Sequence, residues 1–188
     1  MITEGYKAQL FQMRKEADPK KKWGTTGARN FGTPLVGYLM HFPRIGTVLD
    51  FGAGEKTLEK YVKEHLDRPI EWTNYDPGIK GIDVPPEGKF DLIVSSDVLE
   101  HIEPEEIGNV LDWCADHARL SQYHHIACFA AGKILPDGRN VHLIVEDVDW
   151  WVDTFKRPGW DIQLYSQQMK RKRSAWQRSC QIQTDKLG

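Results

Sequence analysis

Short apolar runs alternate with segments of helical periodicity along most of the chain. The apolar run at residues 47–51 predicts a buried strand, and residues 55–66 after it predict a helix, because Leu58, Val62 and Leu66 fall on one helical face. The predicted strands lie at residues 47–51, 70–75, 80–84, 90–95, 123–130, 160–168 and 174–184. The predicted helices lie at residues 34–42, 55–66, 104–118 and 147–155.

Strands that alternate with helices predict a parallel sheet with right-handed crossovers and helices on both faces. Residues 90–95 form a continuous apolar run, as expected for a central parallel strand. The last two strands, on either side of a basic turn, predict a C-terminal antiparallel hairpin strand. We therefore predict one α/β domain over residues 1–188, with a helical arm or lid at 1–43 and a core at 44–188.

Composition narrows the class of protein. The 25 basic and 27 acidic residues give a net charge of −2, so no global charge favours nucleic acid or a membrane surface. Cys114, Cys128 and Cys180 lack C-x-x-C spacing, and we interpret them as buried thiols in a reducing compartment. The N-terminus lacks a signal-peptide core, and no run approaches the ~18 apolar residues of a membrane span. We expect a soluble, cytoplasmic protein.

The strand at residues 47–51 is followed by a glycine turn that suits a nucleotide-like ligand. Gly52 and Gly54 permit positive φ and close approach of a ligand to the backbone. A nicotinamide-binding G-x-G-x-x-G motif would require a third glycine where this chain has Thr57, which argues against a dehydrogenase. An ordinary glycine-rich turn between strand and helix is the alternative.

The segment Asp50-Phe51-Gly52-Ala53-Gly54 resembles motif I of the class I S-adenosylmethionine-dependent methyltransferases, with Lys56 where many members have another glycine. Asp97-Val98-Leu99-Glu100-His101 resembles the segment after the fourth strand of these enzymes. The resemblance covers about residues 45–185. It implies a seven-stranded Rossmann-like methyltransferase sheet, S-adenosylmethionine as cofactor, and methyl transfer as the activity.

Ligands of such sheets bind outside the carboxyl ends of the strands. The resemblance implies that Asp50 lies near the cofactor's ammonium group, that Asp76 accepts hydrogen bonds from the ribose hydroxyls, and that Asp83 contacts the adenine amine. The alternatives are a turn-capping role for Asp76 and a solvated loop position for Asp83. The full set of predicted cofactor-binding residues is Asp50, Gly52, Ala53, Gly54, Asp76, Pro77, Asp83, Ser96 and Asp97.

Two histidines are candidates for catalysis. His101 follows the central strand, and an imidazole can remove a proton from a hydroxyl or amine near neutral pH. Its alternative role is to brace the turn before Pro104. His142 precedes the predicted Trp-containing helix and is the second candidate.

The spacing of Asp97, Glu100 and His101 also suggests a metal site, because residues at i, i+3 and i+4 share one side of a helical turn. This D-x-x-E-H segment resembles the E-x-x-E-H metal motif of small-RNA 2′-O-methyltransferases and ubiquinone-pathway O-methyltransferases. The resemblance implies Mg²⁺ or Mn²⁺ held by Asp97, Glu100, His101 and His142. Metal-independent relatives also carry an acid-histidine pair here, so both possibilities stay open.

The acceptor is predicted only by class. The main hypothesis is an oxygen or nitrogen of a small metabolite, sugar or nucleotide, and the alternatives are metal-assisted RNA ribose 2′-O-methylation and an inactive cofactor-binding partner subunit. Lys170, Arg171, Lys172 and Arg173 form a basic turn that we expect at the ligand edge, with nucleic acid as a candidate partner, and Lys20–Lys22 beside Trp23 add to it. Trp23, Trp150 and Trp151 are candidates for lining the acceptor site.

Overall fold

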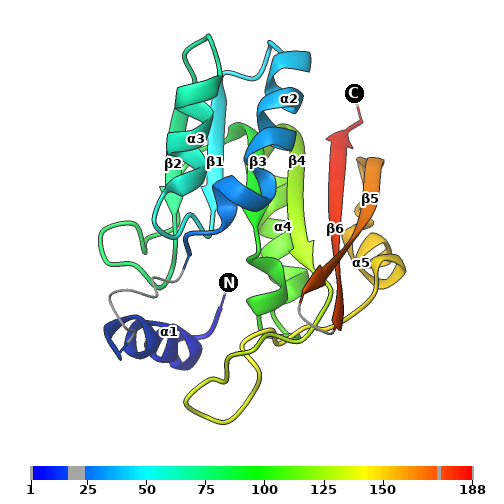
Figure 1. Ribbon diagram of the computed structural model, residues 1–188. Coiled ribbons are helices and arrows are strands. Elements are labelled where there is room, and N and C mark those ends of the chain that lie inside the picture. The colour runs from blue at the N-terminus through cyan, green and yellow to red at the C-terminus, as the bar shows by residue number, and fades with distance from the viewer. Residues whose placement is uncertain (1, 17–23, 173–174, 188) are drawn as a thin grey trace.

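The computed structural model describes residues 2–16, 24–172 and 175–187 (Figure 1). A six-stranded sheet forms its centre, with strand order β2-β1-β3-β4-β6-β5. The strands are β1 (Thr47–Phe51), β2 (Glu71–Tyr75), β3 (Phe90–Ser96), β4 (Ala118–Ala127), β5 (Trp160–Lys172) and β6 (Ala175–Lys186). The helices are α1 (Glu4–Glu16), η1 (Ala28–Gly32), α2 (Thr33–His41), α3 (Thr57–His65), η2 (Leu99–His101), α4 (Ile107–His117) and α5 (Val148–Phe155).

The first four strands pair in parallel, and β6 pairs antiparallel with β4 and with β5. Because β4 and β5 are both antiparallel to β6, β5 runs parallel to β4. The predicted mixed sheet with a C-terminal hairpin is therefore confirmed. The hairpin is longer than predicted, so Lys170, Arg171 and Lys172 belong to β5, while Arg173, Lys20–Lys22 and Trp23 lie outside the described residues.

The prediction of seven strands was wrong. Residues 80–84 form no strand, because the main chain after β2 folds back on itself: Asp76 N donates to Ile82 O at 2.8 Å and Ile79 N donates to Asp76 O at 3.1 Å. Gly81 has φ +94°, which turns the chain within this loop. The backbone groups that a third strand would offer to β2 are partly used inside the turn, so β2 remains the edge of the sheet.

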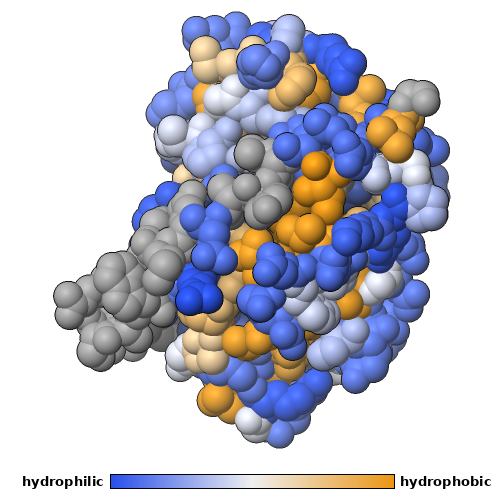
Figure 2. Space-filling view, turned by 90° about the vertical axis from the view of Figure 1, so that its right-hand side faces the viewer, coloured by the Kyte–Doolittle hydropathy of each residue, from blue (hydrophilic) through white to orange (hydrophobic). Residues whose placement is uncertain are grey.

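Apolar side chains alternate between the two faces of the sheet, as strand geometry requires. Leu92 and Val94 of β3 pack in a cluster with residues of α2 and α3, while Ile93 joins the opposite cluster with Leu111 of α4 and Trp151 of α5. The side of the molecule near β5 and α5 is mostly hydrophilic, with hydrophobic residues gathered in separate patches (Figure 2). Within the described ranges, no helix has both the length and the apolar character needed to cross a bilayer.

Helix α1 lies at the carboxyl ends of the parallel strands (Figure 1). Tyr6 is buried in a small cluster with Leu135 and Val141, which come from the loop between β4 and α5. Thr3 donates two hydrogen bonds to the Glu103 carboxylate, at 2.9 and 2.8 Å. The N-terminal arm is thereby fastened over the edge where the sequence predicts a ligand.

Candidate cofactor and acceptor site

The glycine turn after β1 is closed by contacts that leave no room for side chains. Gly52 and Gly54 have φ values of +81° and +54°. A Cβ at Gly52 would lie 2.4 Å from Cγ2 of Val98, and a Cβ at Gly54 would lie 2.5 Å from the carbonyl oxygen of Gly24. Gly24 O also accepts a hydrogen bond from Glu55 N at 3.0 Å. The turn is therefore packed against the loop that leads into η1.

Asp50 and Asp76 stand at the ends of adjacent strands and differ in their hydrogen bonding. Asp76 accepts hydrogen bonds from Gly54 N at 3.0 Å and Gly78 N at 2.9 Å, and from Nη2 of Arg14 at 3.0 Å. Asp50 is buried, and its Oδ2 has no partner among the described residues. Burial, followed by the charges of Asp76 and Glu59, raises the pKa of Asp50 to about 8. A cationic ligand group would relieve this repulsion.

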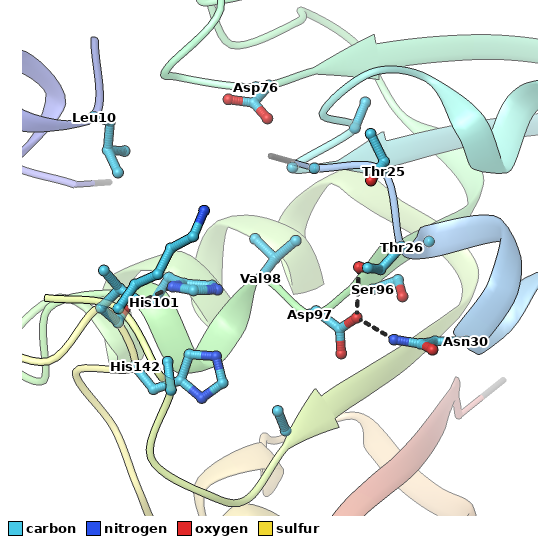
Figure 3. A pocket seen from close by; sticks show the side chains of 18 of the residues that line it. Leu10, Thr25, Thr26, Asn30, Asp76, Ser96, Asp97, Val98, His101 and His142 are labelled. Carbon is cyan, nitrogen blue, oxygen red and sulfur yellow. Dashed lines mark hydrogen bonds between the residues drawn. The ribbon is translucent and has the colours of Figure 1, made fainter. Parts of the chain in front are cut away.

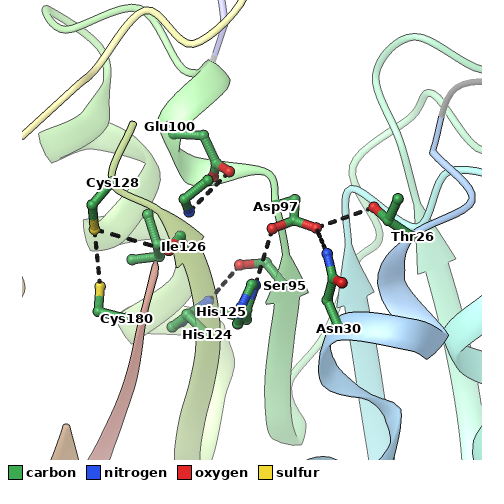
Figure 4. Close-up of polar contacts among 11 residues, drawn as sticks. Thr26, Asn30, Ser95, Asp97, Glu100, His124, His125, Ile126, Cys128 and Cys180 are labelled. Atoms are coloured by element: carbon green, nitrogen blue, oxygen red, sulfur yellow. Dashed lines mark hydrogen bonds and ion pairs between the residues drawn. The ribbon is translucent and has the colours of Figure 1, made fainter. Parts of the chain in front are cut away.

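Asp97 joins three segments that are distant in sequence (Figure 4). Its Oδ2 accepts hydrogen bonds from Thr26 at 3.1 Å and Asn30 at 2.7 Å, and its Oδ1 lies 3.0 Å from Nδ1 of His125. Burial opposes its ionisation, but the bond to His125 and the other donors outweigh burial and lower the pKa of Asp97. Asp97 thus anchors the loop before η1 to strands β3 and β4.

A cavity of about 450 Å³ opens at this edge of the sheet. Asp76 lies across it from His101 and His142, with Val98 between them (Figure 3). Of the predicted residues, the cavity is lined by Asp50, Gly52, Ala53, Asp76, Pro77, Ser96, Asp97, His101 and His142. The buried Oγ of Ser96 and hydroxyl of Tyr6, another lining residue, have no partner within the described part of the chain. The cavity therefore offers unsatisfied polar atoms to a ligand.

Other predicted residues lie elsewhere. Gly54 faces Gly24 behind the lining. The structure does not bring Asp83 to the cavity, because its carboxylate accepts from Gly81 N at 3.0 Å and pairs with Lys7 at 3.4 Å. Both tryptophans belong to α5: the Trp151 side chain is fully buried in the core, and Trp150 packs against the same cluster. Neither tryptophan lines the cavity.

Glu100, His101 and His142 form a compact cluster, in which one ligand atom of each lies within 4.8 Å of the others. Nδ1 of His101 donates to Val141 O at 2.6 Å, and Nδ1 of His142 donates to Phe129 O at 2.5 Å. These bonds fix the tautomers, so that Nε2 is the basic nitrogen of both rings. Asp97 does not belong to this cluster. Its carboxylate is bonded to Thr26, Asn30 and His125, although its spacing predicted a metal ligand.

Burial controls ionisation in this cluster. It lowers the pKa of His101 to about 4, with His142 contributing, and it also lowers the pKa of His142. Glu100 is fully buried; Ala127 N donates to its Oε1 at 3.0 Å, and Oε2 has no partner among the described residues. Burial, then the charge of Asp97, raises the pKa of Glu100. Two neutral imidazoles beside a buried carboxyl can hold a divalent cation.

Several residues of the site carry no sequence signal of their own. Arg14, Thr26 and Asn30 belong to the N-terminal arm, whose polar composition gave no indication of where it packs. His125 lies in a strand, and its position beside Asp97 depends on the pairing of β3 with β4. The one sequence signal for a role of His125 was the presence of a polar histidine inside a buried strand.

Comparison with known proteins gave matches in structure alone. No protein-family model and no curated protein sequence matched the chain. Its fold is similar to 1,6-didemethyltoxoflavin-N1-methyltransferase from Burkholderia thailandensis, with a TM-score of 0.66 and 15% identity over 100% of this chain and 92% of that one. It is also similar to the N-methyltransferase NodS from Bradyrhizobium japonicum, with a TM-score of 0.62 and 12% identity over 98% of this chain and 100% of that one.

A third similar structure is an S-adenosylmethionine-dependent methyltransferase from Clostridium acetobutylicum, with a TM-score of 0.58 and 9% identity over 96% of this chain and 98% of that one. The first two of these structures contain S-adenosylhomocysteine. The chain therefore has the Rossmann-like fold of S-adenosylmethionine-dependent methyltransferases, which confirms the fold that its motifs imply except for the seventh strand.

Proposed function

We propose that this protein is an S-adenosylmethionine-dependent methyltransferase acting on an oxygen or nitrogen of a small metabolite, sugar or nucleotide. One observation carries the proposal. The cavity at the carboxyl edge of the sheet unites Asp50, the Gly52–Ala53 turn and Asp76, which are the groups that an adenosyl sulfonium needs. The similar structures with S-adenosylhomocysteine support this choice of ligand.

The residues divide the cofactor between them. The buried Asp50 carboxyl faces the ammonium group, and Asp76 accepts from the ribose hydroxyls. Gly52 N and Ala53 N already donate to Tyr75 O at 2.7 and 3.0 Å, so these amide hydrogens are not available to the cofactor. The turn contributes space instead, because it carries no large side chain. Pro77, Ser96 and Asp97 complete the lining, and Gly54 and Asp83 support the loops behind it.

Methyl transfer forms a bond from the acceptor to the methyl carbon while the sulfonium C–S bond breaks, and the sulfur becomes a neutral thioether. Charge is lost at the reacting centre, so alignment and exclusion of water supply much of the rate. His101 and His142 lie across the cavity from Asp76 and can accept the acceptor's proton. Burial lowers the pKa of both imidazoles, to about 4 for His101, so each of them is a weak base in the ligand-free protein.

Isothermal titration calorimetry with S-adenosylmethionine and S-adenosylhomocysteine tests the proposal. Asp76→Asn should weaken both ligands by at least about tenfold, because it replaces charged acceptors by a neutral amide. Asp83→Asn is the matched control, since it changes the same chemical group outside the cavity. Absence of affinity in the unaltered protein would overturn the proposal. Product detection across metabolite and RNA pools then separates an enzyme from an inactive partner subunit.

A second candidate function, metal-assisted O-methylation, is favoured by the cluster of Glu100, His101 and His142. Both imidazoles donate through Nδ1 to backbone carbonyls, which is the usual support of metal-bound histidines. Oε2 of Glu100 is buried and has no hydrogen-bond partner in the part of the chain that the structure describes. Two imidazole nitrogens and one carboxylate oxygen fit Mn²⁺ better than Mg²⁺, which prefers oxygen ligands, and the bound ion would lower the pKa of an acceptor hydroxyl such as a ribose 2′-hydroxyl. Turnover in chelator, with and without added Mg²⁺ or Mn²⁺, tests this candidate, and unchanged turnover would dismiss it.

The basic end of β5 supports an anionic acceptor, including nucleic acid. The pairing of β6 with β4 ends near Ser179 and Arg178, whereas β5 and β6 stay paired out to Lys172 and Ala175. The hairpin therefore extends past the carboxyl end of β4, and Gln177 reaches the cavity lining. Reversing the charges of Lys170, Arg171, Lys172 and Arg173 should weaken an anionic acceptor and leave cofactor affinity intact. Unchanged kinetics with such an acceptor would refute this contribution.

A further inference from the structure

Two of the three cysteines meet across neighbouring strands, although 52 residues separate them (Figure 4). The sulfur atoms of Cys128 and Cys180 lie 3.6 Å apart. Cys180 lies on β6 opposite Ile126 of β4, and Cys128 N donates to Arg178 O at 3.0 Å, which continues the ladder by one step beyond β4. The two side chains therefore lie diagonally on the same face of an antiparallel pair.

The two thiols differ in accessibility and acidity. Cys128 is half-buried, whereas Cys180 is buried. The hydrogen bond with Cys180 and the nearby Arg178 lower the pKa of Cys128, and the same bond together with burial raises the pKa of Cys180. Cys114 is fully buried in α4, and burial raises its pKa to about 12. Cys128 is thus placed as the reactive thiol, with Cys180 as its neighbour.

We propose that Cys128 and Cys180 are a redox pair that closes a reversible disulfide between the end of β4 and β6 when the protein meets a peroxide. The Cys128 thiolate attacks one oxygen of hydrogen peroxide and breaks the O–O bond, giving a sulfenic acid and hydroxide. Cys180 sulfur then displaces the sulfenic hydroxyl, which leaves as water with the Cys180 proton. Two thiols are oxidised by two electrons, and one peroxide is reduced.

The geometry makes this step short and local. The sulfur atoms must approach from 3.6 Å to a bond length of about 2.05 Å, which a small movement of the chain just after β4 can supply. That chain also supports the candidate site: Ala127 N donates to Glu100, and Phe129 O accepts from His142. The disulfide therefore forms in the wall of the Glu100–His142 cluster.

Intact-mass measurement of the full chain before and after peroxide treatment tests the pair without reference to activity. We expect the loss of two hydrogen atoms, a peptide cross-link between Cys128 and Cys180, and recovery of the mass with dithiothreitol. Cys114→Ser should behave like the unaltered protein. Cys180→Ser should trap Cys128 as a sulfenic acid that a dimedone reagent labels, and Cys128→Ser should give neither the label nor the cross-link.

Three results would overturn the proposal: no loss of two hydrogens, a cross-link that includes Cys114, or a cross-link between two chains. The unaltered protein and Cys114→Ser already report the mass change and the cross-link. The test therefore remains valid if Cys128→Ser or Cys180→Ser folds poorly. The experiment also stands if the protein binds no S-adenosylmethionine, since it measures the thiols themselves.

Discussion

Nη2 of Arg14 donates to Oδ2 of Asp76 at 3.0 Å, which ties α1 to the end of β2. The same carboxylate accepts from Gly54 N and Gly78 N. A carboxylate has about four acceptor positions, so these three donors leave one. A ribose diol needs two. If Asp76 holds the ribose as proposed, Arg14 competes with the ligand for this carboxylate, and we expect the diol to bind fully only when Arg14 withdraws.

Arg14→Ala should consequently tighten S-adenosylhomocysteine binding by about three- to tenfold, which corresponds to about 1 kcal/mol. Calorimetry at fixed pH and salt measures the change. Lys15→Ala is the matched control, because Lys15 is the exposed neighbour on the same helix and should leave the affinity unchanged. Weaker binding in Arg14→Ala would mean that Arg14 holds Asp76 in position for the ligand instead of competing for it.

Asp50 should make the stability of the ligand-free protein depend on pH. Its pKa is raised from 3.8 to about 8 in the folded state, so the folded protein holds this proton more tightly than the unfolded chain does. The contribution to stability is therefore fully present below about pH 4 and is lost as pH rises towards 8. Asp50→Asn, which cannot ionise, should remove this dependence.

Denaturant unfolding of the two proteins at several pH values measures this difference. The unaltered protein should lose a few kcal/mol more than Asp50→Asn between about pH 4 and pH 8. Parallel curves for the two proteins would show that Asp50 ionises in the folded state near its ordinary pKa. A ligand ammonium should also displace the Asp50 proton, so calorimetry of the unaltered protein near neutral pH should register proton release.

The local elements could be predicted because their signals lie within short stretches of sequence. β1 agrees with its predicted range, and β3 is one residue longer than predicted, since continuous apolar runs identify central parallel strands. The predicted strand at residues 80–84 failed because turn-forming Gly81 and the bond from Asp76 N to Ile82 O favour a closed loop. The glycine turn and Asp76 reach the cavity edge because strand ends meet there.

The parts of the site that could not be predicted depend on tertiary contacts. Asp97 has ligand spacing to Glu100 and His101, but spacing does not indicate that Thr26 and Asn30 occupy its carboxylate. The contact of Cys128 with Cys180 depends on strand register, which composition does not specify.

If Glu100, His101 and His142 hold the metal, substitutions at Glu100 and at Asp97 should affect Mn²⁺ affinity differently, although both residues belong to the D-x-x-E-H segment. Glu100→Gln and His142→Ala should each weaken Mn²⁺ binding by about tenfold or more, because each removes a ligand atom from the cluster. Asp97→Asn should change Mn²⁺ affinity by less than about threefold, because the Asp97 carboxylate is bonded to Thr26 and Asn30. Calorimetry with Mn²⁺ alone measures all three without an acceptor.

His117→Ala is the histidine control for this comparison. Its Nδ1 donates to Trp113 O at 2.8 Å, so it has the backbone bond of a supported histidine but lies outside the cluster. It should leave Mn²⁺ affinity unchanged. If the Asp97 variant weakened Mn²⁺ as much as the Glu100 variant, the three-residue site would be the wrong assignment and the four-residue set suggested by the motif would be preferred.

Gly54, which is buried, should be far less tolerant of a side chain than the half-buried Gly108 in helix α4. Gly54→Ala places a Cβ 2.5 Å from Gly24 O on a residue with φ +54°, so both the backbone strain and the displaced loop lower stability, by about 2 kcal/mol. Gly108→Ala in α4 meets no atom within 4 Å and should stabilise by up to about 1 kcal/mol.

Chemical unfolding of the two alanine variants measures the contrast, and S-adenosylhomocysteine titration gives a second reading. Gly54→Ala should bind the ligand more weakly, because Gly24 and the cavity-lining Thr25 and Thr26 beside it must shift when the Cβ enters their space. Gly108→Ala should bind as the unaltered protein does. Equal stability and equal affinity of the two variants would mean that the loop before η1 does not pack on the glycine turn in solution, and that the turn alone forms the ligand's contact surface.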